Sequence, residues 1–271
     1  MPSLVDDLVI VGKNYLGLRK ECKYEGCFVA GTLVHTDKGL VPIEQLKIGD
    51  MVLSKNENGK GEQAYKRVIN TFKSAEKLPI VKVQFQNPNK SCSEMHLFCT
   101  DNHPFWALTE EEYESGWNWK PALDLEIQAA YVIDLNESRL LLSETTSYLF
   151  ATCETGIAYE IYGYSRGRFL DGYSMIVDFR DGNPTLITAE NGWVYSFNEN
   201  SWHPSENIYV LPNASPEKKF YEDVMSKTED LFLENALCLD DTYYMDYVYN
   251  IEVEDLHTYY VGKAGIWVHS S

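Results

Sequence analysis

Short runs of alternating apolar and polar residues, separated by glycine-containing turns, are the feature that most constrains this chain. Residues 27–36 show a strand–turn–strand pattern, and residues 82–86 and 93–100 alternate as half-buried strands do. Asp171-Gly172 and Asn191-Gly192 separate further strand-like runs, and such dipeptides favour tight hairpins. The pattern predicts a mostly β fold.

Composition and charge exclude several classes of protein. The chain has 271 residues, of which 44% are hydrophobic, so it can bury a large core. Its formal net charge is −18, whereas a nucleic-acid binder needs a basic surface to neutralise phosphates. No apolar run approaches the ~18 residues of a membrane span. The six cysteines are too few for a disulfide scaffold, so reactivity better explains at least one of them.

Two segments of the chain echo one another. Residues 42–48 and 121–127 share a proline, a leucine and an isoleucine in register, and each is followed by a short strand-like run, at 51–54 and 131–135. A duplicated β unit explains this echo.

Residues 143–245 read as a separate, acidic unit. They hold 17 of the 41 acidic residues of the chain but only 6 of its 23 lysines and arginines. Strand-like runs fill the first part, and a helix is predicted from Ser215, as N-cap, to about Leu237. We interpret this unit as an insertion that stabilises the protein or binds a partner, because its charge argues against DNA binding.

Cys27 is the first candidate for chemistry. It follows Gly26, and because glycine has no side chain, the Gly26 carbonyl is open to close approach. A thiol beside its own amide can attack that carbonyl and convert the amide to a thioester, provided that the departing amine is protonated. The alternative is a buried structural cysteine, the commonest fate of a free cysteine.

Thr100 and His103 are the second candidate group, at the end of an apolar strand. A histidine with a pKa near ~6.5 can deliver a proton to a leaving nitrogen and take it back. A threonine hydroxyl or backbone N–H can hold a developing oxyanion. The alternative is an ordinary turn that ends a strand. Two further histidines, His257 and His269, lie late in the chain.

Together these segments resemble the Hint (hedgehog/intein) domain. Four stretches match its sequence blocks in the right order, namely residues 27–34, 100–104, 248–262 and 266–269. The sequences of these stretches most resemble those of the pretoxin Hint domains of bacterial polymorphic toxins. The resemblance implies a pseudo-twofold horseshoe of short strands, interrupted by a β-rich insertion with one helix. It predicts four parts: an upstream, N-extein-like leader (1–26), a Hint N-terminal part (27–142), the acidic insertion (143–245) and a Hint C-terminal part (246–271).

The resemblance also implies roles for the first group of residues. Cys27 would be the nucleophile and Gly26 the acyl donor, with Thr100 and His103 assisting the shift of the acyl group from nitrogen to sulfur. The chain would then be a single-turnover, intein-like cysteine autoprotease that needs no cofactor or metal.

A second cleavage, at the C-terminal junction, is implied with an important departure. His257 and His269 would assist it, and Asn250 takes the position where many inteins have an aspartate that couples the two steps. The family normally places an asparagine after the last histidine, and this asparagine cyclises to a succinimide. Here Ser270 stands there, ahead of Ser271. A serine has no amide nitrogen, so we expect this cleavage to fail.

The implied partners are the flanking sequences as substrate and a downstream toxin module, in a bacterial protein destined for secretion or delivery to a target cell. An alternative is an inactive Hint-fold connector whose insertion engages a protein partner. A cysteine protease acting on other proteins is a distant third, because nothing in the sequence indicates a groove for foreign substrates.

Two other cysteine arrangements compete with this reading. Cys92, His96, Cys99 and His103 have a spacing that zinc ligands can show, but residues 96 and 99 of an extended strand point to opposite faces. A Cys22–Cys27 disulfide would cap the nucleophile, and only an oxidising compartment would favour it.

Overall fold

The computed structural model describes residues 26–88, 94–109, 116–125, 130–143, 146–152, 155–160, 164–165, 168–169, 175–190, 193–198, 201–204 and 239–270. Regular structure in these residues is mostly β, as predicted, and their helices are the two 3-10 turns η2 (Ile43–Gln45) and η3 (Ala122–Asp124). No helix among the described residues is long and apolar enough to cross a bilayer. The helix predicted over 215–237 lies outside the described residues.

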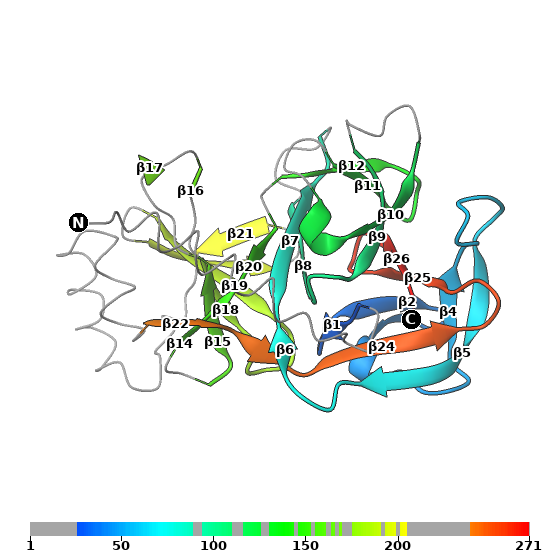
Figure 1. The fold of residues 1–271 in the computed structure, drawn as a ribbon, viewed down its shortest axis with the longest axis horizontal. Coiled ribbons are helices and arrows are strands. Elements are labelled where there is room, and N and C mark those ends of the chain that lie inside the picture. The colour runs from blue at the N-terminus through cyan, green and yellow to red at the C-terminus, as the bar shows by residue number, and fades with distance from the viewer. Residues whose placement is uncertain are drawn as a thin grey trace.

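Fifteen of the described strands form one antiparallel sheet (Figure 1). They are β1 (Phe28–Val29), β2 (Leu33–Thr36), β3 (Gly39–Pro42), β4 (Met51–Ser54), β5 (Ala64–Lys73), β7 (Val81–Gln86), β8 (Glu94–Cys99), β9 (Pro104–Leu108), β10 (Asn118–Pro121), β11 (Tyr131–Ile133), β12 (Arg139–Leu142), β13 (Ser147–Tyr148), β24 (Val248–Val253), β25 (Thr258–Val261) and β26 (Ile266–His269). Their order is β10-β9-β11-β12-β7-β8-β1-β24-β5-β4-β2-β25-β26, with β3 beside β2 and β13 beside β7. Because β26 also pairs with β9, through Val268 and Phe105, the sheet closes on itself.

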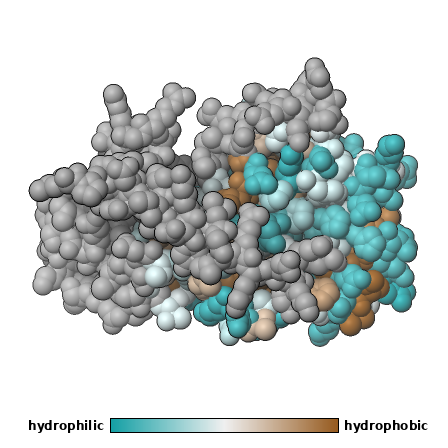
Figure 2. All heavy atoms as spheres, viewed as in Figure 1, coloured by the Kyte–Doolittle hydropathy of each residue, from teal (hydrophilic) through white to brown (hydrophobic). Residues whose placement is uncertain are grey.

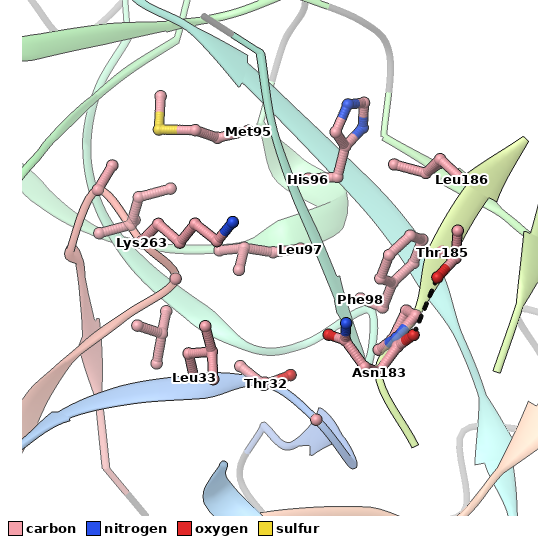
Figure 3. A pocket seen from close by; sticks show the side chains of 16 residues that line it. Thr32, Leu33, Met95, His96, Leu97, Phe98, Asn183, Thr185, Leu186 and Lys263 are labelled. Carbon is pink, nitrogen blue, oxygen red and sulfur yellow. Dashed lines mark hydrogen bonds between the residues drawn. The ribbon is translucent and has the colours of Figure 1, made fainter. Parts of the chain in front are cut away.

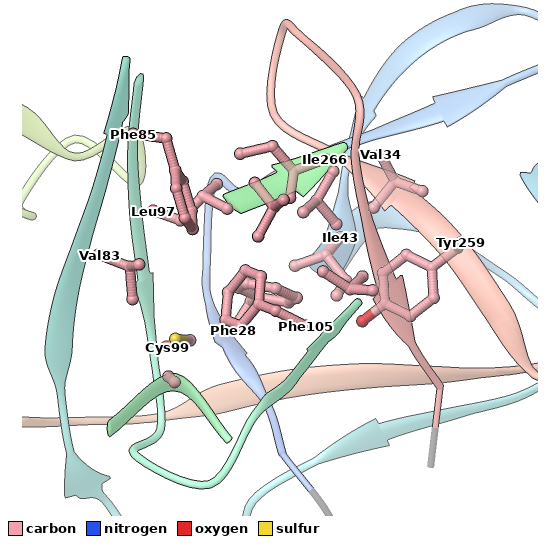
Figure 4. Close-up of a cluster of buried hydrophobic side chains, with 14 of the residues drawn as sticks. Phe28, Val34, Ile43, Val83, Phe85, Leu97, Cys99, Phe105, Tyr259 and Ile266 are labelled. Carbon is pink, nitrogen blue, oxygen red and sulfur yellow. The ribbon is translucent and has the colours of Figure 1, made fainter. Parts of the chain in front are cut away.

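The closed sheet surrounds the first hydrophobic core. Strands such as β2 and β4 alternate between buried and half-buried residues, so one face of each supplies the core. Phe28 lies at the centre, with its ring 6.4 Å from that of Phe105 and 6.4 Å from that of Tyr259, both edge-on. Figure 4 shows these rings meeting aliphatic side chains from the surrounding strands.

The two segments of the sequence echo adopt the same local structure. Each forms a 3-10 turn after a proline, η2 after β3 and η3 after β10. The N–H of Ile43 donates to the carbonyl of Thr32 at 2.8 Å, and the N–H of Ala122 donates to the carbonyl of His103 at 2.9 Å. The duplication therefore puts His103 and Thr32 in equivalent places, each just before the strand that pairs with the proline-ended one.

A second sheet is built from residues of the predicted insertion. Its order is β21-β20-β19-β18-β15-β14-β22, and its strands are β14 (Phe150–Thr152), β15 (Ile157–Glu160), β18 (Met175–Asp178), β19 (Thr185–Glu190), β20 (Trp193–Asn198), β21 (Ser201–Pro204) and β22 (Leu239–Tyr243). Two further pairs are β6 (Leu78–Pro79) with β23 (Met245–Asp246), and β16 (Tyr164–Ser165) with β17 (Arg168–Phe169). Glu190 pairs with Trp193, which brackets the predicted Asn-Gly hairpin.

Apolar packing and one buried ion pair join the two sheets. A second core cluster combines residues of β1, β8 and β24 with residues of β15, β18 and β19. Beside it, the ammonium of Lys82 on β7 lies 2.5 Å from the carboxylate of Glu160 on β15, and both side chains are buried. Strand β13 of the predicted insertion belongs to the large sheet, so the boundary at residue 143 stays a prediction.

The described surface in Figure 2 is largely hydrophilic, with brown confined to small areas. The large hydrophobic side chains that stay exposed among the described residues are Leu40, Ile48, Tyr65, Ile69, Met245 and Tyr247.

Candidate active site

Strand pairing places Cys27 between two other polar residues. Phe28 pairs with Cys99 on one side and with Tyr249 on the other. In antiparallel pairing, the residue before Phe28 therefore faces the residues after Cys99 and after Tyr249, which are Thr100 and Asn250. Cys27 itself is 3% exposed and its side chain belongs to the second core cluster, against the insertion.

Thr100 contacts both backbone groups of Cys27. Its Oγ1 accepts a hydrogen bond from the N–H of Cys27 at 2.9 Å, and its own N–H donates to the carbonyl of Cys27 at 2.9 Å. The sequence led us to expect the Thr100 hydroxyl or N–H at an oxyanion. The structure places both against Cys27 instead, where the hydroxyl holds the amide nitrogen that thioester formation would release.

Asn250 contacts the carbonyl group of the Gly26–Cys27 peptide bond, whose nitrogen contacts Thr100. Its Nδ2 donates to the carbonyl oxygen of Gly26 at 2.5 Å. Its Oδ1 accepts from the hydroxyl of Tyr259 at 2.9 Å and from the N–H of Ile251 at 2.7 Å. The Asn250 side chain is 2% exposed. The Gly26–Cys27 peptide thus has a side-chain hydrogen bond at its oxygen and another at its nitrogen.

Gly26 is required at its position for two reasons. Its φ is +43°, in the left-handed region that favours glycine. A Cβ added there would come within 2.5 Å of the Cα and 2.8 Å of the Nδ1 of His103, and within 2.8 Å of the Cδ of Pro104. The His103 imidazole therefore lies directly against Gly26.

His103 is completely buried and neutral at physiological pH. Burial lowers the pKa of its imidazole to about 3; contact with the Gly26 backbone opposes this, and the nearby His269 adds to it. The ring packs on Phe28, with 4.0 Å between ring centroids, and lies 5.5 Å from the ring of Phe105. A neutral imidazole can accept a proton from a thiol and pass it on.

Two buried neighbours keep their protons. Burial raises the pKa of the Tyr259 hydroxyl, so it stays a phenol that can donate to Asn250. Burial likewise raises the pKa of the Cys99 thiol, which faces the first core rather than the second. Cys99 is therefore an unreactive cysteine one strand away from Cys27.

The predicted C-terminal group is partly assembled. The N–H of Ser270 donates to the carbonyl of His257 at 2.8 Å, but the His257 side chain is exposed and its φ is +53°. Ser270 is 1% exposed, and its hydroxyl has no hydrogen-bond partner among the described residues. A role for the His257 side chain stays a prediction. Ser271 lies outside the described residues.

His269 lies at the carbonyl of position 270. Its Nδ1 is in contact with the carbonyl oxygen of Ser270, and its Nε2 lies 3.2 Å from the carboxylate of Glu57. The edge of its ring meets Trp119, with 5.0 Å between centroids, and Trp119 packs in turn on Trp267. A role for His269 in cleavage after residue 270 stays a prediction.

No group of three or more His, Cys, Asp or Glu side chains is arranged to hold a metal ion within the described ranges. Cys92 of the zinc alternative and Cys22 of the disulfide alternative lie outside those ranges.

A separate cavity of about 360 Å³ lies between the large sheet and the insertion (Figure 3). Leu33, Leu97 and Lys263 line one side, and Asn183 and Leu186 of the insertion line the other. Neither Cys27 nor His103 lines it, so it is not part of the candidate active site.

Comparison with known proteins supports the sequence reading in part. Residues 26–115 match the family model of the Hint domain, and the match begins at Gly26 and includes Thr100 and His103. No curated protein matches the chain. Among solved structures, a bacterial intein-like domain from Clostridium thermocellum is similar, at 18% identity over 90% of this chain and 98% of that chain, with a TM-score of 0.45. A DnaB intein from Synechocystis sp. is 10% identical over 91% of this chain and 99% of that chain, with a TM-score of 0.41.

The sequence did not single out Tyr259 or the hydrogen bonds of Asn250. The contact between Tyr259 and Asn250 depends on how two strands of the closed sheet face the core, and no local pattern encodes that.

Proposed function

We propose that this protein cleaves its own backbone between Gly26 and Cys27 through a thioester, as an intein-like, single-turnover cysteine autoprotease. The observation that carries the proposal is the double attachment of one peptide bond: its oxygen to Asn250 at 2.5 Å and its nitrogen to Thr100 at 2.9 Å. A buried imidazole lies against the same bond. A structural cysteine needs none of these contacts.

The proposed reaction has two steps. The Cys27 sulfur attacks the carbonyl carbon of Gly26, a C–S bond forms, and the C–N bond to Cys27 breaks. The thiol proton passes by way of the neutral His103 to the Cys27 nitrogen, which leaves as an amine. Water or an added thiol then attacks the thioester, which releases residues 1–26 and restores the Cys27 thiol.

The C-terminal step is not part of the proposed activity. Ser270 lacks the amide nitrogen that would have to attack the carbonyl of its own residue. Release of a downstream module, including a toxin module, would need another route, and both that module and the bacterial secretion context remain predictions from the resemblance.

Ser270 is also the observation that favours the second candidate function. A chain that has Ser270 in place of the cyclising asparagine is also consistent with an inactive connector. In such a connector the fold holds neighbouring segments and the insertion binds a protein partner. The two functions differ in one respect, because a connector has no use for the Cys27 thiol.

Intact mass spectrometry separates the two functions. The parent, Cys27→Ala and Cys99→Ala proteins are incubated with dithiothreitol at neutral pH. Cys99→Ala is the matched control, because it removes a buried cysteine whose raised pKa keeps it unreactive. Loss of residues 1–26 from the parent and from Cys99→Ala, but not from Cys27→Ala, supports the autoprotease. Full-length masses that do not change on incubation in any of the three proteins would exclude it and leave the connector.

A further inference from the structure

We propose that Asn250 is a catalytic residue, the oxyanion donor of the Gly26–Cys27 cleavage, and that Tyr259 is its positioning residue. This inference rests on the proposed function, since it names the group that stabilises the transition state of that reaction. It differs from the role expected at this position, where an aspartate would couple two cleavage steps.

The orientation of the Asn250 amide is fixed by its surroundings. The backbone N–H of Ile251, which can only donate, lies 2.7 Å from one side-chain atom of Asn250. That atom must therefore be the oxygen, and the NH₂ group must face Gly26. The Tyr259 hydroxyl donates to the same oxygen at 2.9 Å, which leaves no reason for the amide to turn.

The contact gains strength as the reaction proceeds. When sulfur adds to the Gly26 carbon, the carbonyl oxygen becomes negatively charged, and a hydrogen bond to an anion is about twice as strong as a neutral one. The site is buried and its donor is already aimed, so no reorganisation is needed. A carboxylate at position 250 could not donate and would repel the developing charge.

The hydroxyl and the backbone N–H of Thr100 already have other hydrogen-bond partners. The Thr100 hydroxyl accepts from the Cys27 N–H, and the Thr100 N–H donates to the Cys27 carbonyl, so both serve the residue after the reacting carbon. Asn250 donates a hydrogen bond to the Gly26 oxygen, whereas the His103 imidazole, which also lies against the Gly26 backbone, is the proposed proton carrier. The oxyanion site is thus built from β24 rather than from Thr100, which directly follows β8.

Tyr259 acts through Asn250. The Tyr259 side chain is fully buried, and burial raises the pKa of its hydroxyl. This hydroxyl donates to Asn250, which is nine residues earlier in the chain. Removing the hydroxyl frees the Asn250 oxygen on one side while Ile251 still holds it. We therefore expect Tyr259→Phe to weaken the alignment rather than abolish it.

The test reads the Gly26 carbonyl directly, without any cleavage. Gly26 followed by alanine is the only Gly-Ala step in the sequence of Cys27→Ala, so carbonyl-¹³C glycine with ¹⁵N-alanine gives a single HNCO signal from the reacting peptide. Losing a donor should move the Gly26 ¹³C′ signal upfield in Asn250→Ala and Asn250→Asp, and by a smaller amount in Tyr259→Phe. Asn70→Asp is the matched control, because Asn70 on β5 makes the same bond to the next N–H at 2.9 Å, but this bond is open to solvent and Asn70 is only half-buried.

Cleavage rates test whether Asn250 contributes to catalysis, and they are measured in proteins that keep Cys27. Asn250→Ala should slow thiol-dependent release of residues 1–26 by about 10²–10³-fold, and Tyr259→Phe by roughly three- to tenfold. Asn70→Asp should cleave at the parent rate. An unchanged carbonyl shift, or a parent rate, in Asn250→Ala would overturn the inference. A parent protein that does not cleave sinks the proposed function and the catalytic role together, while the carbonyl shift still decides whether Asn250 holds Gly26.

Discussion

Thr100 is hydrogen-bonded to both the N–H and the C=O of Cys27, at 2.9 Å in each case. The pair lies 73 residues apart in the chain and is brought together by the pairing of β1 with β8. The Cys27 N–H therefore donates to a side-chain hydroxyl and not to the backbone carbonyl of a neighbouring strand. This nitrogen is the one that leaves in the proposed reaction.

Thr100→Val should therefore damage the site while keeping its shape. The substitution leaves the buried Cys27 N–H without its acceptor, which costs about 1–3 kcal/mol of stability. We expect thiol-dependent cleavage to slow at least tenfold, measured by the loss of intact mass over time. Thr100→Ser keeps the hydroxyl and should stay within a few-fold of the parent. Equal rates for the valine and serine variants would contradict this role.

Gly26→Ala should block cleavage. Alanine strains the left-handed backbone of residue 26 and drives its Cβ into the backbone of His103, which displaces the carbonyl from Asn250. Gly61→Ala separates strain from contact, because Gly61 also has a positive φ, +87°, but open space around it. Only the residue 26 variant should lose thiol-dependent release of the leader, and retained release there would count against the geometry of the site.

His103 should make the protein less stable in mild acid. Its pKa is about 3 in the folded state and near 6.5 when unfolded, so the unfolded chain binds a proton that the folded chain does not. Stability from this group is complete above pH 6.5 and is lost as pH falls toward 3, at up to about 1.4 kcal/mol per pH unit. Urea unfolding of Cys27→Ala at pH 7 and pH 5 should show about 2 kcal/mol of additional loss compared with Cys27→Ala carrying His103→Gln. The same pH dependence in both proteins would refute the buried, neutral imidazole.

Gly31→Ala should loosen the junction with the insertion. A Cβ at Gly31 would come within 2.0 Å of the Gly182 carbonyl oxygen and 2.9 Å of the Cα of Asn183. Gly39 has a similar positive φ but nothing within 4 Å, so Gly39→Ala reports backbone strain alone. Chemical unfolding should show Gly31→Ala to be less stable than Gly39→Ala by about 1–3 kcal/mol. Equal stabilities would mean that the Gly182 turn moves away at no cost.

Ser270→Asn should restore the missing C-terminal chemistry. It supplies an amide nitrogen at a buried position whose carbonyl already contacts His269. With a reporter domain fused after Ser271, we expect slow release of the reporter, followed by gel electrophoresis and mass spectrometry. Ser270→Ala is the control that adds no amide and should release nothing. Absence of release from both would show that the remaining C-terminal residues do not support cyclisation.

Local signals in the sequence predicted the local structure well. The predicted Asn191-Gly192 turn separates β19 from β20, and the proline-led echo forms η2 and η3 in matching hydrogen-bonded settings. Turn chemistry and strand alternation act over a few residues, so they can be read from the chain. The helix predicted after Ser215 lies outside the described residues and stays a prediction.

Contacts between distant strands could not be predicted in the same way. That Asn250 reaches Gly26, 224 residues away, follows from the register of β1 against β24, which depends on closure of the whole sheet. The sequence singled out His257 for its side chain, but the structure brings its carbonyl to Ser270 and leaves its ring exposed. Residue type identified the candidates, whereas register decided which of their atoms meet.

Trapping the acyl group with hydroxylamine is the most direct test for a thioester between Gly26 and Cys27. At neutral pH hydroxylamine attacks thioesters but leaves ordinary amides intact, so a peptide released by it records where the activated carbonyl was. We predict a fragment of residues 1–26 whose Gly26 carries a hydroxamate, absent from Cys27→Ala and strongly reduced in Asn250→Ala. No fragment from the parent, or a hydroxamate at any other residue, would contradict this prediction.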